Sequence, residues 1–194
     1  MSELPPLLFD GPRNATDTFA FAHGAGVGME NDFLNHFAQG LANRGIRVAR
    51  FEFPYMQKSR ADGKRRPPDR APILLETWRT IIDELSGNNL YIGGKSMGGR
   101  LASMIAVELE TEATPIKGVL CLGYPFHPPG KPEKLRTEHL ASLKTPSLIL
   151  QGTRDPFGTQ EEVSGYTLSK DIKLHWLSDG EHSFKPRKKS GRTM

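Results

Sequence analysis

The chain has 194 residues, of which 37% are hydrophobic, so it can bury one sizeable core and gives little reason to expect a second domain. No stretch approaches the ~18 apolar residues of a membrane span, and no basic region followed by an apolar run opens the chain. The chain has a net charge of +4, but its positive charge gathers in residues 58–70 and 183–194 while the rest of the chain is negative overall, and neither segment has the interleaved aromatic residues of a nucleic-acid site. We therefore expect a single domain over 1–194 of a cytoplasmic protein that binds neither membranes nor nucleic acid.

Two short apolar runs, residues 7–9 and 18–22, predict strands, and the first of them fits only a short edge strand. The second runs directly into the Gly-rich loop 23–28. A dinucleotide-binding G-x-G-x-x-G motif fails in this loop because Met29 stands where the third glycine is required. The loop instead fits an oxyanion hole, in which small residues expose backbone N–H groups, and Ala25 would supply one of them.

Helical and strand patterns alternate in the next part of the chain. Residues 32–44 have apolar side chains at helical spacing, and residues 46–53 predict a second buried strand. Residues 55–72 are rich in Arg, Lys and Pro and have no apolar periodicity, which predicts a long loop. Helical spacing returns at residues 73–85. This alternation is typical of a parallel sheet with helical crossovers.

The strand at residues 90–93 runs into the motif G-x-S-x-G, in which Ser96 is the serine; this is the pattern of a nucleophile elbow, a sharp turn between a strand and a helix. Small residues on both sides let this strand crowd against the following helix, residues 97–109, while the serine is held in strained backbone. The backbone N–H of Met97 would then be a second oxyanion donor. A phosphate-binding loop, G-x-x-x-x-G-K-S, fails because Asn89 stands where it needs glycine.

Two further buried strands are predicted at residues 116–122 and 147–151. Only about two dozen residues separate them, which leaves no room for a lid domain. This connection begins with a rigid loop rich in Pro and Gly, in which we assign Tyr124 and Phe126 to substrate binding, and it ends in a short helix at residues 138–143.

The last part of the chain supplies the acid and the base that a serine nucleophile requires. Residues 161–168 predict a weak helix and residues 172–177 an outer strand. A serine hydroxyl is a poor nucleophile at pH 7 unless a base accepts its proton and a carboxylate orients that base. Asp155 and His182 each follow a strand, in the chain order Ser, Asp, His that the elbow architecture requires. We therefore predict a catalytic triad of Ser96, Asp155 and His182 at the carboxyl edge of the sheet.

Other residues compete for these roles. Asp179 is the rival acid, but it stands three residues before His182 in one loop, which does not suit an acid from a separate strand. His175 lies inside a strand and is expected to pack, and His23 is expected to hold its loop by hydrogen bonds. The single cysteine, Cys121, sits in an apolar run and is expected to be a small buried hydrophobe.

With these motifs in place, the sequence resembles the α/β-hydrolase superfamily over nearly its whole length. More narrowly, it resembles the small lidless branch related to the testis-expressed and non-specific-lethal-complex hydrolase-like proteins. Six segments carry the narrower likeness: 23–26, 65–68, 94–100, 122–132, 151–156 and 182–187. The resemblance implies a doubly wound, mainly parallel sheet of six or seven strands, a serine-hydrolase triad on Ser96, Asp155 and His182, and little about the substrate, since the branch includes members with scaffolding roles.

We expect a serine hydrolase that cleaves small carboxylic esters through an acyl-enzyme, with no cofactor and no metal ion. The alternative is a non-catalytic interaction module with the same fold. Members of the fold usually continue beyond the histidine loop into a final helix, whereas this chain stops at Met194. Either the helix is absent, in which case a protein partner or a second copy is expected to cover the C-terminal side, or the sequence is truncated. The two basic segments are interpreted as solvated surface, or alternatively as a surface that attracts an anionic ester or an acidic partner.

Overall fold

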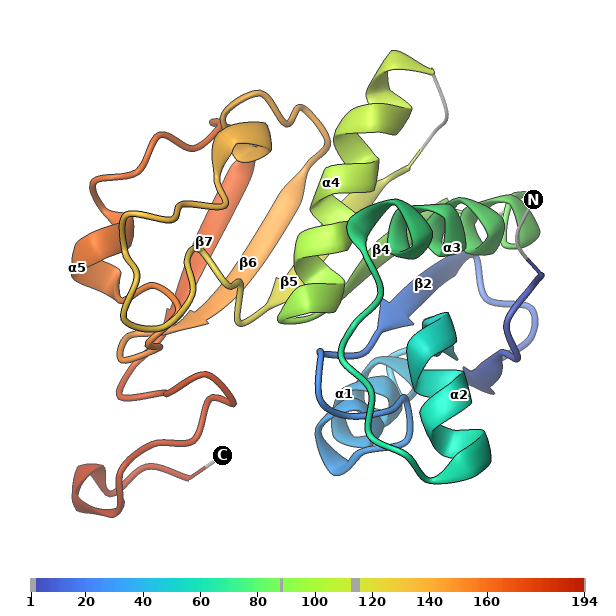
Figure 1. The fold of residues 1–194 in the computed structure, drawn as a ribbon, viewed down its shortest axis with the longest axis horizontal. Coiled ribbons are helices and arrows are strands. Elements are labelled where there is room, and N and C mark those ends of the chain that lie inside the picture. The colour runs from blue at the N-terminus through green and yellow to red at the C-terminus, as the bar shows by residue number, and fades with distance from the viewer. Residues whose placement is uncertain (1–2, 88, 113–115, 194) are drawn as a thin grey trace.

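The computed structural model describes residues 3–87, 89–112 and 116–193, which build a seven-stranded sheet with helices on both faces (Figure 1). The order across the sheet is β1 (Leu8–Asp10), β3 (Arg47–Phe51), β2 (Asp17–Ala22), β4 (Asn89–Lys95), β5 (Gly118–Leu122), β6 (Ser147–Gly152) and β7 (Ile172–Leu177). The edge strand β1 is antiparallel to β3, and every other neighbouring pair is parallel. The predicted doubly wound, mainly parallel sheet is thus confirmed.

The order of the strands reverses beside β2. The chain steps from β2 to β3 on one side and then returns to β4 on the other side of β2. Ala22 at the end of β2 is paired in register with Gly94 near the end of β4. The loops that follow these two strands therefore diverge from one point at the carboxyl edge, where ligands of open parallel sheets bind.

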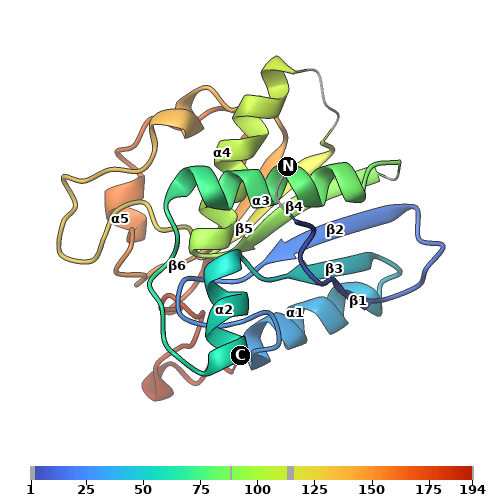
Figure 2. The same ribbon diagram turned by 45° about the vertical axis from the view of Figure 1, so that its right-hand side comes forward.

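Helices cover both faces of the sheet (Figure 2), and the buried apolar side chains form two clusters. Helices α3 (Ala71–Glu84) and α4 (Met97–Thr111) cover one face, where Trp78 and Ile105 are fully buried. Helix α1 (Asp32–Ala42) covers the other face through Leu34 and Ala38, which pack with aromatic side chains of β2. The amphipathic spacing that predicts α1 and α3 is what these two layers require.

The segment predicted as a long loop, residues 55–72, contains a helix, so that prediction is wrong. Helix α2 spans Pro54–Asp62 and buries only Tyr55, which explains the missing apolar periodicity. Pro54 stands in the first turn, where its fixed φ favours a helix and its missing N–H costs nothing. The backbone N–H of Tyr55 donates to Asp69 Oδ2 at 2.9 Å. This helix is therefore held by polar contacts at its start.

The remaining helices are short. The connection between β5 and β6, residues 123–146, is described throughout and contains only the 3₁₀ helix η1 (Glu138–Ala141), so no lid domain lies there. The predicted helix at 161–168 is shorter than expected, since α5 spans only Gln160–Val163, and η2 (Lys188–Ser190) is a single 3₁₀ turn. Within the described ranges, every helix is too short or too polar to cross a bilayer.

Candidate active site

Ser96 stands in the tight turn between β4 and α4, with φ 51° and ψ −115°. Positive φ is uncommon for a residue with a side chain, so the surrounding packing must hold this strained backbone. Two glycines permit that packing. A Cβ on Gly94 would lie 2.5 Å from the carbonyl oxygen of Ala22, and one on Gly98 would lie 2.7 Å from that of His23. The strand, strained turn and helix that the sequence predicts are therefore present.

The side chains of Ser96, His182 and Asp155 form one hydrogen-bonded row. His182 Nε2 lies 2.9 Å from Ser96 Oγ, and its Nδ1 lies 2.8 Å from Asp155 Oδ2. The Asp155 carboxylate is fully buried, whereas the His182 side chain is 19% exposed. Asp155 Oδ1 accepts the Phe157 N–H at 2.9 Å, and Oδ2 also accepts from Gln151 Nε2 at 3.0 Å. The loops after β4, β6 and β7 thus bring the three predicted residues together.

Two contacts that sequence reasoning missed hold His182 in this row. The ring of Phe157 lies over the imidazole with its centroid 4.2 Å away. The buried Nζ of Lys95 donates a hydrogen bond of 2.7 Å to the backbone carbonyl of His182 and lies near the rings of Phe33 and Phe184. Burial lowers the pKa of Lys95 to about 8, although nearby carboxylates oppose this change. In the sequence, the one sign of the Lys95 contact is the position of this lysine directly before Ser96.

The Gly-rich loop after β2 lies directly against the elbow, because a Cβ on Gly24 would be 3.8 Å from the Cβ of Ser96. Fully buried His23 fixes the start of this loop. Its Nδ1 donates to the Gly24 carbonyl at 2.7 Å, and its Nε2 accepts the Phe53 N–H at 3.2 Å. Burial lowers the pKa of His23, which keeps the ring neutral. His23 is therefore a structural residue, as predicted.

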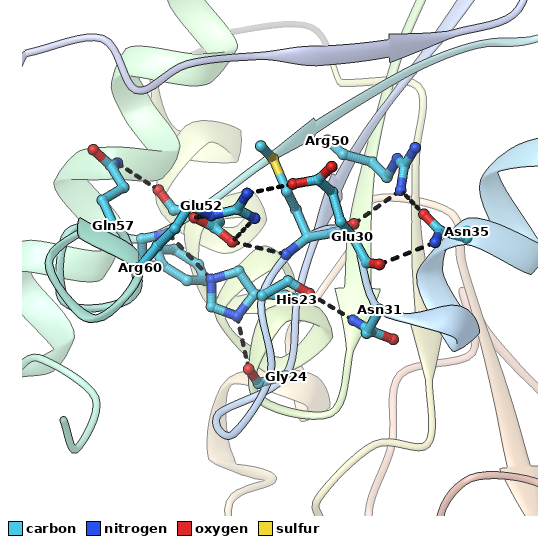
Figure 3. A network of polar contacts seen from close by, with 12 residues as sticks. His23, Gly24, Glu30, Asn31, Asn35, Arg50, Glu52, Gln57 and Arg60 are labelled. Carbon is cyan, nitrogen blue, oxygen red and sulfur yellow. Dashed lines mark hydrogen bonds and ion pairs between the residues drawn. The ribbon is translucent and has the colours of Figure 1, made fainter. Parts of the chain in front are cut away.

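Glu52 connects the far end of the same loop to α2 (Figure 3). Its carboxylate is almost fully buried and accepts the Met29 N–H at 3.1 Å. Arg60 donates to both oxygens of Glu52, at 3.0 and 2.7 Å. From the first turn of α2, the Tyr55 hydroxyl donates to the Ala25 carbonyl at 3.0 Å. The predicted oxyanion loop is thus held at several points by α2.

The two predicted oxyanion donors come from the two segments that meet at the Ser96 turn, Ala25 in the loop after β2 and Met97 at the start of α4. In the part of the chain that the structure describes, neither backbone N–H has a hydrogen-bond acceptor. Both donors are therefore available to a ligand.

Tyr124 and Phe126, which we assigned to substrate binding, are fully buried instead. Their rings pack together in the core at a centroid distance of 4.8 Å. The Tyr124 hydroxyl donates to the Arg136 carbonyl at 2.8 Å, which satisfies the polar end of the ring. Neither side chain presents surface to a ligand, so this assignment is corrected.

The competing residues have other partners. The Asp179 carboxylate accepts hydrogen bonds from the backbone and side chain of Arg187 and pairs with Arg154, so it braces the histidine loop. His175 is expected to pack, but it is exposed on β7, so that expectation is wrong. Cys121 is buried as predicted, and burial raises the pKa of its thiol to about 12.

A groove of about 1040 Å³ runs between α1 and the C-terminal segment. Phe33, Phe37, Leu177 and Phe184 form its apolar wall. Among the described residues, no group of three or more His, Cys, Asp or Glu side chains is arranged to hold a metal ion.

Comparison with known proteins gives one family and a set of similar folds. A family model described as an alpha/beta hydrolase domain matches residues 15–194. Dienelactone hydrolase from Anabaena variabilis is similar with a TM-score of 0.72 and 21% identity, over 92% of this chain and 82% of that one. Est1E from Butyrivibrio proteoclasticus, with ferulic acid bound, is similar with a TM-score of 0.72 and 16% identity, over 96% of this chain and 90% of that one. An alpha-beta serine hydrolase homologue from Coxiella burnetii is similar with a TM-score of 0.68 and 18% identity, over 91% of this chain and 82% of that one.

Proposed function

The chain belongs to the alpha/beta hydrolase domain family, and from this premise we propose that it is a serine hydrolase that cleaves small carboxylic esters through an acyl-enzyme. The observation that carries the proposal is the hydrogen-bonded row of Ser96, His182 and Asp155, with heavy-atom distances of 2.9 and 2.8 Å. These distances lie within the reach required of a nucleophile, its base and the group that orients the base.

Proton transfer would run along this row. The Nδ1–H of His182 donates to the buried Asp155 carboxylate, which leaves Nε2 as the acceptor of the Ser96 proton. Ser96 Oγ attacks the ester carbonyl, and His182 returns the proton to the departing alcohol. Water, deprotonated by His182, then attacks the acyl-enzyme and releases the acid with Ser96 regenerated. One ester and one water give one acid and one alcohol.

The tetrahedral oxyanion would be bound by the backbone N–H groups of Ala25 and Met97. The loss of one such donor typically raises the barrier by roughly 3 kcal/mol. Support comes from the hydrogen bonds that hold the Ala25 loop to α2, since fixed donors need no reorganisation during the reaction.

The proposed substrates are small because the β5–β6 connection, residues 123–146, supplies no lid that would enclose a long acyl chain. The same short connection, together with the six sequence segments described above, supports our further proposal that the chain is related to the lidless branch of testis-expressed and non-specific-lethal-complex hydrolase-like proteins.

Turnover of 4-nitrophenyl acetate and butyrate tests the proposal. The wild type should hydrolyse both esters, and His182→Ala should lose nearly all of this turnover. His175→Ala is the matched control, because it removes an exposed histidine from the neighbouring strand and should behave like the wild type. Equal activity in the wild type and His182→Ala would refute the proposed mechanism.

A non-catalytic interaction module is the second candidate. The apolar groove between α1 and the C-terminal segment favours it, since it offers Phe33, Phe37 and Phe184 to a partner or a second copy of the chain. Turnover that depends on His182 would exclude a module without catalytic activity.

A further inference from the structure

Two arginines near the elbow, Arg100 on α4 and Arg136 just before η1, have no charge partner. Both are partly buried, yet no carboxylate and no hydrogen-bond acceptor contacts either guanidinium within the described residues. The Nε of Arg100 is fully buried without a hydrogen bond. By contrast, the buried Arg50 and the partly buried Arg79 are both paired with carboxylates. A buried polar atom without a partner in a native fold calls for a missing ion, water or ligand group.

The two arginines stand on the two sides of the contact between α4 and the segment that leads into η1. Ser103 stands one turn after Arg100 on α4, and its Oγ lies 2.9 Å from Nε2 of His139 in η1. Arg136 precedes His139 by three residues, and its carbonyl accepts the Tyr124 hydroxyl, which lies 3.3 Å from the same Nε2. The two arginines thus approach this polar cluster from the two elements that contact there.

The electrostatics of the cluster agree with this placement. Burial, followed by the positive charge of Arg100, lowers the pKa of Arg136. The same two causes lower the pKa of His139 to about 4, so this histidine is neutral at neutral pH. Two like charges lie close together and partly out of water, an arrangement that is costly until an opposite charge joins it.

Arg100 stands close to the proposed nucleophile in the chain. Its backbone N–H donates to the Ser96 carbonyl at 3.0 Å, which places Arg100 one helical turn, about 6 Å, along α4 from the serine. Long side chains on a helix tend to lean toward its N-terminus, which is the end of α4 that Ser96 caps. Arg136 is held by its own N–H, which donates to the Phe126 carbonyl at 2.8 Å in the loop after β5, the strand next to β4.

We propose that Arg100 and Arg136 together bind an anionic oxyacid group, a carboxylate or a phosphate, on the substrate of Ser96. This inference rests on the proposed function and specifies its substrate class, an ester that carries a negative charge a few atoms from the bond to be cleaved. The planar guanidinium fork matches the two oxygens of a carboxylate or phosphate.

A pair of esters that differ in charge tests the substrate class. The neutral ester is 4-nitrophenyl butyrate, and the charged one is 4-nitrophenyl hydrogen glutarate. Arg100→Gln and Arg136→Gln should each lower kcat/KM for the glutarate ester by roughly 10- to 100-fold, the range for a hydrogen bond to a charged group, with little change for butyrate. Arg13→Gln, which removes an exposed arginine at the opposite edge of the sheet, should change neither. An equal fall for both esters, or no fall, would overturn the inference.

Direct binding separates this inference from the proposed function. Ser96→Ala, which cannot form an acyl-enzyme, is titrated calorimetrically with glutarate and with inorganic phosphate, and the tighter of the two identifies the oxyacid group. Adding Arg100→Gln or Arg136→Gln should weaken that binding at least tenfold. Absence of binding in a protein whose wild type hydrolyses butyrate would refute the anion site alone, whereas arginine-dependent binding without any ester turnover would refute the hydrolase alone.

Folding of the variants is checked by circular dichroism and thermal melting. Arg100→Lys and Arg136→Lys keep the charge but lose the planar fork, so they serve where a Gln variant does not fold. Made in the Ser96→Ala protein, the Lys variants should bind whichever of glutarate and phosphate binds more tightly to that parent, but with lower affinity than the parent does. Unchanged affinity in both Lys variants would contradict a guanidinium site.

Discussion

Replacement of Lys95 by Met tests how the histidine loop is held. Met has a similar length and fills the same buried space without a charge. The Lys95 side chain is only 6% exposed, and its Nζ donates to the His182 carbonyl at 2.7 Å. The substitution therefore removes both a buried charge and an anchor of the proposed catalytic base.

The two losses have opposite effects on stability. A lysine pKa of about 8 in the fold, against 10.5 in its ordinary state, means that the charged form costs roughly 3 kcal/mol of folding free energy. This cost is fully present below pH 8 and disappears as the pH rises from 8 to 10.5, because only the unfolded chain then still holds the proton. The hydrogen bond of the neutral amine contributes about 0.5–1.5 kcal/mol, which Lys95→Met loses at every pH. Lys95→Met should accordingly be more stable than the wild type by roughly 2 kcal/mol at pH 7, and this difference should disappear near pH 10.

Urea unfolding of both proteins at pH 7, 8.5 and 10 measures this difference. Turnover of 4-nitrophenyl butyrate at pH 7 should fall about tenfold through kcat, with little change in KM, because the base is displaced while the substrate site is intact. Lys173→Met, which replaces an exposed lysine on β7, is the control for both measurements. A difference in unfolding free energy that stays constant from pH 7 to 10 would refute the buried charge, and unchanged kcat would refute the anchoring role.

Three further substitutions test other parts of the site. Asp155→Asn should keep the fold by circular dichroism but lower kcat by roughly 10⁴-fold, since the amide favours the wrong histidine tautomer, and retention of activity would exclude Asp155 as the orienting acid. Gly98→Ala would place its Cβ 2.7 Å from a backbone oxygen of His23, so urea unfolding should show a loss of about 1–3 kcal/mol, and wild-type stability would contradict the close approach. Arg60→Ala should lower kcat several-fold at unchanged KM by releasing Glu52 from the oxyanion loop, and equal kinetics would show that this network does not position the loop.

The parts of the site that follow strands could be predicted from sequence. Short apolar runs between helical patterns place Ser96, Asp155 and His182 after parallel strands, and parallel strands bring their carboxyl ends to one edge. The structure places His182 within hydrogen-bond distance of both Ser96 and Asp155. Local pattern and topology were sufficient because each residue stands within a few positions of its strand.

Features that depend on contacts between distant segments could not be predicted. Helix α2 buries a single side chain, so it carries no apolar period, and its contacts come from Asp69 and Glu52. An aromatic residue in a loop, such as Tyr124, gives no sign of whether it faces a ligand or the core; here its hydroxyl finds a backbone carbonyl inside the protein. The role of Lys95 likewise depends on its burial beneath the histidine loop.

Covalent labelling of Ser96 tests the central claim most directly. A fluorophosphonate probe reacts with an activated serine, so the wild type should gain one adduct in its intact mass, and the labelled peptide should contain Ser96. Ser96→Ala should gain none, and His182→Ala should react far more slowly because the serine lacks its base. An unlabelled wild type, or an adduct that persists in Ser96→Ala, would contradict the account.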